Sequence, residues 1–102
     1  MRLEHESYEK IKEGILAILR KYLDLEEYRV FFFGSRVAGN NFEHADIDIG
    51  VEGPKPIPAD VRLEINEDLE NLPILYKIDF VDFKEVSEEF RKIALQQVEY
   101  IN

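Results

Sequence analysis

The sequence contains no cysteine, and it has neither long apolar runs nor clusters of basic side chains. Without cysteine, a disulfide framework, a thiolate metal site and a cysteine nucleophile are all excluded. The apolar runs, such as residues 15–19, are far shorter than the roughly 18 residues that a membrane-spanning helix needs. The first ten residues are polar and lack the apolar centre of a signal peptide. These absences predict a cytoplasmic protein that does not enter a membrane.

Basic residues are in the minority, since 22 Asp and Glu side chains stand against 13 Lys and Arg and give a formal net charge of −9. Proteins that hold nucleic-acid phosphates use clustered Lys and Arg, and here no run of adjacent basic residues is longer than two. Strong direct binding to nucleic acid is therefore not expected. With 102 residues, of which 45% are hydrophobic, the chain is expected to form one domain, residues 1–102, around one core.

Hydrophobic periodicity predicts helices and strands in the order α-β-β-α-β-α. The expected helices cover residues 7–23, about 58–71, and a segment capped by Ser87 in which Phe90, Ile93 and Ala94 face inward. The expected strands cover residues 28–33, 46–51 and 75–83. Residues 98–101 either extend the last helix or form a small strand. The fold class is therefore α/β (α+β), a small mixed β-sheet with helices packed on one face.

Strict alternation along two of these strands places carboxylates on one face of the sheet. Asp46 and Asp48 point away from Ile47 and Ile49, and Asp79 has the parity opposite to Ile78. Like charges two positions apart on a strand repel each other, so an Asp-x-Asp pair favours a bound cation. Mg²⁺ fits best, because it uses one or two carboxylates together with substrate phosphates. The alternative is that all three residues are ordinary solvent-facing Asp on an open sheet.

Gly34 and Ser35 directly follow the first strand. Glycine permits a close approach of the backbone, and the amides of a following helical turn can hold a phosphate with help from the Ser hydroxyl. Arg36 comes next and is a further candidate for a phosphate contact. Taken alone, the pair is better explained by an ordinary turn, and Arg36 by an exposed loop arginine.

Together the two features form a longer pattern, a strand followed by Gly-Ser, ten residues and Asp-x-Asp. This stretch, FFFGSRVAGNNFEHADIDIGV at residues 31–51, resembles the nucleotidyltransferase superfamily that includes DNA polymerase β. More narrowly, it resembles the minimal nucleotidyltransferase (MNT) branch, whose genes often lie beside that of a HEPN-domain protein. The third carboxylate of this family lies on a later strand between hydrophobic residues, as Asp79 does between Ile78 and Phe80.

The resemblance implies a polymerase β-like fold and a role for each residue of the motif. Gly34 and Ser35 would hold the nucleotide phosphates, with Arg36 beside them. Asp46 and Asp48 would bind Mg²⁺, with two ions expected, and Asp79 would complete the metal site and activate an acceptor hydroxyl. ATP would be the substrate, and pyrophosphate would leave.

Three positions test how far this pattern extends. Asp82 is the competing third carboxylate, but its parity is opposite to that of Asp79, so it should not converge with Asp46 and Asp48. Many relatives carry Arg at the position of Ala38 and Ser at that of Ala45. The missing arginine puts the strength of catalysis in question, and not the fold.

The chain has no second domain to bind an acceptor, so a partner protein is expected to supply it. In the MNT family the paired HEPN protein is an RNase toxin, and the MNT protein is the antitoxin that transfers AMP to a tyrosine of the toxin. The first hypothesis is that this chain does the same. The second is a catalytically weak binding module that neutralises its partner by occlusion, and the third is a stand-alone transferase for a small molecule. The exposed sheet edges also permit a homo-oligomer.

Overall fold

The computed structural model describes residues 7–34 and 46–102. Along the chain its elements are α1 (Tyr8–Arg20), β1 (Arg29–Phe33), β2 (Ile47–Glu52), α2 (Ala59–Glu70), β3 (Ile78–Asp82), α3 (Glu88–Ala94) and β4 (Glu99–Tyr100). The predicted order is confirmed. Of the two alternatives for the end of the chain, the structure has the small strand.

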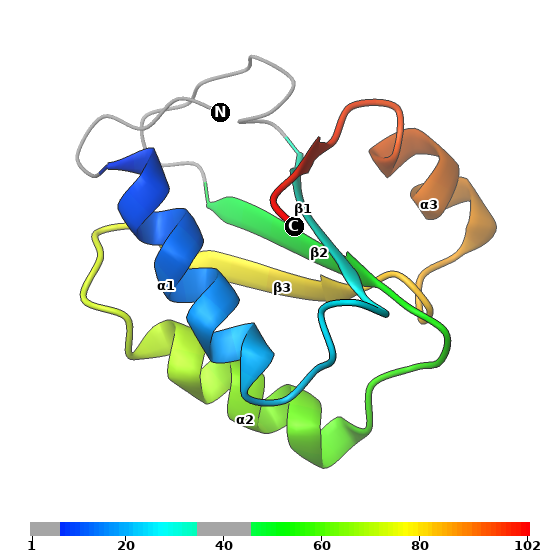
Figure 1. Cartoon of the computed structure of the whole chain (residues 1–102). Coiled ribbons are helices and arrows are strands. Elements are labelled where there is room, and N and C mark those ends of the chain that lie inside the picture. The colour runs from blue at the N-terminus through cyan, green and yellow to red at the C-terminus, as the bar shows by residue number, and fades with distance from the viewer. Residues whose placement is uncertain (1–6, 35–45) are drawn as a thin grey trace.

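The four strands form one mixed sheet in the order β3-β2-β1-β4. β1 runs antiparallel to β2 and β4, whereas β2 and β3 are parallel and joined by α2. α1 and α2 lie next to each other on one side of the sheet, and α3 stands on the other side of β1 (Figure 1). Within the described ranges, no helix combines the length and the apolar character needed to cross a membrane.

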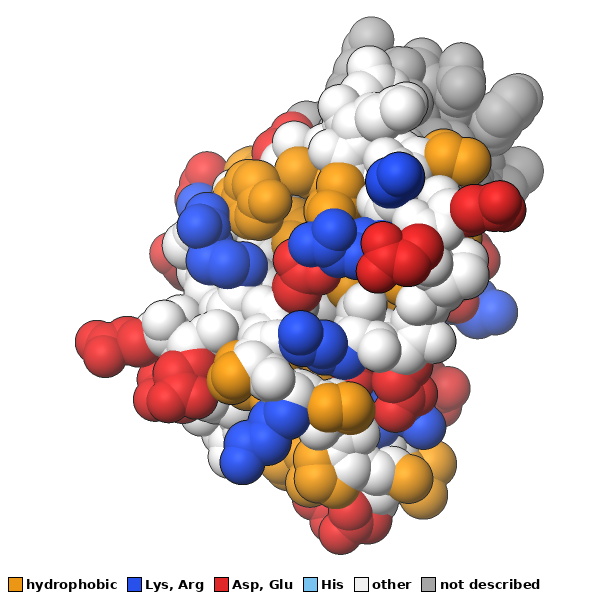
Figure 2. Space-filling view, turned by 90° about the vertical axis from the view of Figure 1, so that its right-hand side faces the viewer, with side chains coloured by type: hydrophobic (Ala, Val, Ile, Leu, Met, Phe, Trp, Pro, Cys, Tyr) orange, Lys and Arg blue, Asp and Glu red, His pale blue; other side chains and the backbone are white. Residues whose placement is uncertain are grey.

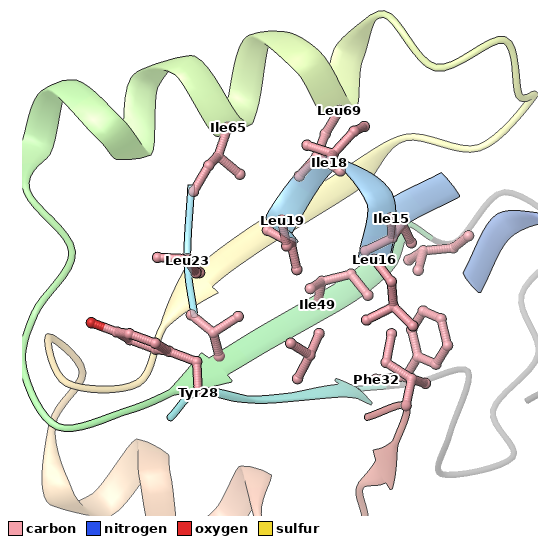
Figure 3. Close-up of a cluster of buried hydrophobic side chains, with 14 of the residues drawn as sticks. Ile15, Leu16, Ile18, Leu19, Leu23, Tyr28, Phe32, Ile49, Ile65 and Leu69 are labelled. Carbon is pink, nitrogen blue, oxygen red and sulfur yellow. The ribbon is translucent and has the colours of Figure 1, made fainter. Parts of the chain in front are cut away.

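The main core lies between the sheet and the helices α1 and α2 (Figure 3). Alternate strand residues point into it, and the fully buried ones include Val30, Phe32, Ile47, Ile49 and Val51. α1 and α2 contribute one stripe each, which includes Ile15, Leu19, Ile65 and Leu69. Burial of such a side chain is worth about 1.5–3 kcal/mol. Because this core lies on one face of β2 and β3, their carboxylates at positions of the opposite parity lie on the other face.

A second, smaller cluster lies on the opposite face of the sheet. Phe31 and Phe33 of β1 pack there with Phe83, and Ala94 and Leu95 cover part of this cluster. The prediction of helices on one face therefore holds for α1 and α2, while α3 lies against the other face. The reason is that β1 is apolar on both sides, so both of its faces need cover.

The prediction that Phe90 and Ile93 face inward is wrong. α3 contains no buried residue; the exposed fraction is 42% for Phe90 and 70% for Ile93. Ala94 does face the cluster as predicted. The helix has only seven residues, so it covers the sheet with one edge and leaves its other apolar side chains at the surface.

Candidate active site

Asp48 and Asp79 lie side by side on neighbouring strands. The parallel register of β2 and β3 pairs Asp48 with Asp79, and neighbouring strands are about 4.8 Å apart. Asp46 immediately precedes β2, and its side chain shares a hydrogen bond with that of Asp79. The structure therefore places Asp48 and Asp46 each next to Asp79, on the face that alternation predicts for all three.

Their mutual repulsion and partial burial disfavour the ionised forms. The pKa of Asp48 is raised to about 6, first by burial and then by the charges of Asp79 and Asp46. The pKa of Asp79 is raised by burial and by its hydrogen bond and charge interaction with Asp46, while Lys77 acts in the opposite direction. A cluster of this kind becomes favourable when a cation neutralises it.

Gly34, at the end of β1, allows Asp48 to sit where it does. Its backbone has φ of 86°, in the left-handed region that favours glycine. A Cβ at this position would collide with Oδ2 of Asp48 and lie 3.0 Å from its Cγ. Asp48 thus packs directly against the glycine that the sequence singled out for close approach. Ser35, Arg36, Ala38 and Ala45 lie outside the described residues.

The donor set suits a hard divalent cation. In the part of the chain that the structure describes, no three carboxylate or imidazole side chains already converge as a metal-binding cluster; instead, the carboxyl group of Asp46 approaches that of Asp79 and raises its pKa. Carboxyl groups held this close favour a bound proton, which a cation can replace. Carboxylate oxygens are the ligands that Mg²⁺ prefers, so these residues fit Mg²⁺.

The carboxylates of Asp48 and Asp79 open into a groove of about 880 Å³. Its described lining combines them with apolar and amide side chains, namely Phe33, Gly34, Asp48, Asn66, Asp79, Phe80, Val81, Phe90, Ile93, Ala94, Gln96 and Gln97. One end of the groove is therefore acidic, and α3 forms an apolar wall beside it. Sequence analysis missed this wall, because the exposure of one helix edge leaves no mark in the periodicity.

Asp82 does not face the groove, as its parity predicts, and it has a structural role instead. It is 3% exposed, and it accepts hydrogen bonds from the backbone N–H groups of Ile57 (2.8 Å) and Lys84 (2.9 Å). Gly50 was also missed: a Cβ there would collide with the rings of Phe31 and Phe83. A glycine inside a strand is the available signal for such a close approach.

Comparison with known proteins places the chain in a family. Residues 9–101 match the family described as "Polymerase beta, Nucleotidyltransferase". The chain is 31% identical over 85 residues to the probable protein adenylyltransferase MntA of Haemophilus influenzae, an alignment that covers 81% of this chain and 75% of the relative.

Solved structures show the same fold. A chain in a crystal structure of a toxin–antitoxin with AMP-PNP superimposes with a TM-score of 0.73 at 22% identity, covering 89% of this chain and 72% of that one. A chain from the complex of tri-AMPylated Shewanella oneidensis HEPN toxin with MNT antitoxin gives a TM-score of 0.69 at 20% identity, covering 92% and 71%. These matches confirm the predicted α/β fold class. The chain belongs to the polymerase β nucleotidyltransferase family and is a nucleotidyltransferase.

Proposed function

We propose that this protein is an antitoxin that transfers AMP from ATP to a tyrosine hydroxyl of a HEPN toxin. The observation that carries the proposal is that Asp48 and Asp79 lie side by side beside Gly34 in one groove, with Asp46 next to Asp79. Support also comes from the relative named as a protein adenylyltransferase, and from the neighbouring fold found in complex with an AMPylated HEPN toxin.

Each residue of the site then has a role. Gly34 and Ser35 hold the phosphates of ATP, with Arg36 as a further phosphate contact. Asp46, Asp48 and Asp79 would hold Mg²⁺, two ions in all, which would neutralise charge on the phosphates and polarise the α-phosphate.

The chemical step forms one bond and breaks one. The acceptor oxygen attacks the α-phosphorus, the bond from that phosphorus to the β-phosphate oxygen breaks, and pyrophosphate leaves. Asp79 accepts the proton of the acceptor hydroxyl. The remaining work of the protein is to position the two reactants.

The domain assignment and the cellular location belong to the same proposal. Residues 1–102 act as one nucleotidyltransferase domain, which is supported by the family match over residues 9–101. The acceptor is carried by the partner, and the reaction takes place in the cytoplasm, where ATP is available. Neither a membrane nor a nucleic acid is needed for it.

One observation favours a second function. Phe90 and Ile93 expose apolar surface beside the groove, which is typical of a protein–protein contact. The chain could therefore neutralise a partner by binding alone, with catalysis weakened by the departure at Ala38.

Label transfer tests the first function against the second. The protein is incubated with α-labelled ATP, Mg²⁺ and the HEPN protein encoded beside it, and compared with the double variant Asp46→Asn/Asp48→Asn. Asp60→Asn, which removes a carboxylate at the exposed start of α2, is the matched control. We expect label on the HEPN protein with the wild type and the control, and at least a hundredfold less with the double variant. If no label moves while the two proteins still bind each other, the binding module is the correct function.

A further inference from the structure

α3 presents two large apolar side chains that the described structure leaves partly exposed. Phe90 and Ile93 are one helical turn apart and therefore lie on the same face of α3, with exposed fractions of 42% and 70%. Figure 2 shows the side of the molecule on which α3 lies, with apolar side chains gathered in patches among charged ones. Both residues line the groove that also contains Asp48 and Asp79, so the exposed apolar surface is continuous with the acidic site.

The wall is aromatic where it meets the sheet. The ring of Phe90 lies 6.1 Å from that of Phe33 and 5.8 Å from that of Phe83, centroid to centroid. Phe33 is paired with Asp48 in the register of β1 and β2. An aromatic side chain that enters the groove along this wall therefore contacts aromatic residues with its ring, and a polar group at the end of that ring meets the carboxylates. This is the arrangement that suits a tyrosine, which is apolar along its ring and polar at its hydroxyl.

The charge of the groove indicates which kind of partner segment can bind there. The described lining of the groove contains the carboxylates of Asp48 and Asp79 and three amide side chains, and no Lys or Arg. Glu89, which is exposed and one turn before Ile93 on α3, adds another negative charge beside Ile93. A segment that carries Lys or Arg near its hydroxyl is complementary to this surface, whereas an acidic segment is repelled.

We propose that the α3 wall, formed by Phe90 and Ile93, is the docking surface for the acceptor, a segment of the partner protein that presents a tyrosine among basic residues. This inference rests on the proposed function and specifies the surface and the partner chemistry that serve it. In the free protein the two side chains are exposed to water, and binding of the partner buries them.

The test compares two substitutions of equal chemistry. Ile93→Ser removes the apolar surface at the wall, while Leu75→Ser does so at a similarly exposed position, 75% against 70%, outside the groove lining. The affinity for the HEPN protein is measured by calorimetry with wild type and both variants, and transfer kinetics with α-labelled ATP give KM for each substrate. Circular dichroism checks that both variants are folded.

We expect Ile93→Ser to weaken binding of the HEPN protein about tenfold and to raise the KM for the HEPN protein by the same factor. The KM for ATP should stay unchanged. Leu75→Ser should equal wild type in all three measurements. An unchanged affinity overturns the proposal, as does an equal rise of the KM for ATP, which would make the wall a nucleotide-base site. If wild type transfers no label, the proposed function fails, but the affinity comparison still decides the docking surface. The basic character of the partner segment predicts weaker binding as ionic strength rises from about 0.05 to 0.5 M, and a salt-independent affinity contradicts it.

Discussion

Two aspartates three positions apart on β3 serve opposite purposes. Asp79 faces the groove and repels its neighbours, whereas Asp82 is buried and accepts two backbone hydrogen bonds. The Asp82→Asn variant replaces one acceptor oxygen by an NH₂ group that faces a backbone N–H, and an unsatisfied buried donor costs about 1–3 kcal/mol. We therefore expect Asp82→Asn to lower the free energy of unfolding by that amount in urea denaturation, and Asp79→Asn to leave it equal or raise it. Equal losses in the two variants would contradict this division.

Gly34 is constrained both by its backbone and by its neighbour. Gly34→Ala must place a Cβ against Asp48 at a positive φ, and left-handed backbone alone costs a non-glycine residue about 1–2 kcal/mol. Because Asp48 must also move, we expect nucleotidyl transfer to fall at least tenfold, beyond the loss of stability.

Gly14→Ala is the matched control. Gly14 lies inside α1, where a new Cβ would make an ordinary 3.4 Å contact with Leu72, and alanine in a helix is favoured by about 0.5–1 kcal/mol. Thermal melts and transfer rates measured side by side should show a more stable, fully active Gly14→Ala. A Gly34→Ala variant with wild-type activity would show that Asp48 does not depend on this glycine.

At the scale of elements, a side-chain ion pair holds α3 to the sheet. Arg91 donates to both carboxylate oxygens of Glu52 on β2, from Nε at 2.5 Å and from the second guanidinium nitrogen at 2.9 Å. This contact lowers the pKa of Glu52 below its ordinary range. Since α3 has no buried residue, the ion pair and the edges of a few apolar side chains determine where the groove wall stands.

Glu52→Gln should therefore loosen α3 more than it destabilises the protein. A partly exposed ion pair contributes about 1 kcal/mol or less to global stability, so the unfolding midpoint should change little. We expect faster amide hydrogen exchange confined to α3 and a severalfold higher KM for the acceptor. Asp68→Asn weakens the contacts of Asp68 with Lys21 and with the hydroxyl of Tyr22, between α2 and the end of α1, and serves as the control; it should alter neither. Unchanged exchange in α3 would mean that Arg91 does not anchor the helix.

The helices and strands could be predicted because each has a strong local cause. Ser87 accepts a hydrogen bond from the backbone N–H of Phe90 and starts α3 as predicted. Ser7 accepts one from the N–H of Lys10 at the start of α1, a cap that was not predicted. Alternation along β2 assigned Asp46, Asp48 and the core residues to their faces, because the pleat has period two. β3 was predicted too long, at residues 75–83 instead of Ile78–Asp82, since apolar residues before a strand carry no signal of where pairing begins.

The lateral arrangement could not be predicted in the same way. The pairing of Asp48 with Asp79 depends on the register between two strands joined by α2, and alternation fixes faces but not neighbours. The exposure of Phe90 and Ile93 depends on which edge of a short helix meets Phe33 and Phe83. Ser35 and Arg36, which lie outside the described residues, remain predictions, as do the catalytic and metal-binding roles of the three aspartates.

For the whole molecule, the acidic site couples stability to pH and to cations. The pKa of Asp48 is about 6 in the folded protein against about 3.9 in an unfolded chain. Between these values the folded state binds more protons than the unfolded state, so the free energy of unfolding falls as pH rises from about 4 to about 6. Glu52 and Asp68, whose pKa values are lowered, act in the opposite direction, because the stability they contribute is lost as pH falls.

Comparing wild type with Asp48→Asn isolates the site, since both proteins carry the other groups. We expect the two to melt alike near pH 4 and Asp48→Asn to be more stable at pH 7 without metal, by about 1–2 kcal/mol once solvent screening is allowed for. For a domain of this size each kcal/mol corresponds to about 4–8 °C in Tm. Mg²⁺ should raise the Tm of wild type at pH 7 and narrow the difference in stability between wild type and Asp48→Asn. A cation bound by Asp48 offsets both the cost of burying its charge and the repulsion from its neighbours. Parallel pH profiles of stability in the two proteins would show that burial and neighbouring charges do not destabilise ionised Asp48. An equal rise of Tm with Mg²⁺ in both proteins would show that Asp48 is not a ligand and that the cation binds elsewhere.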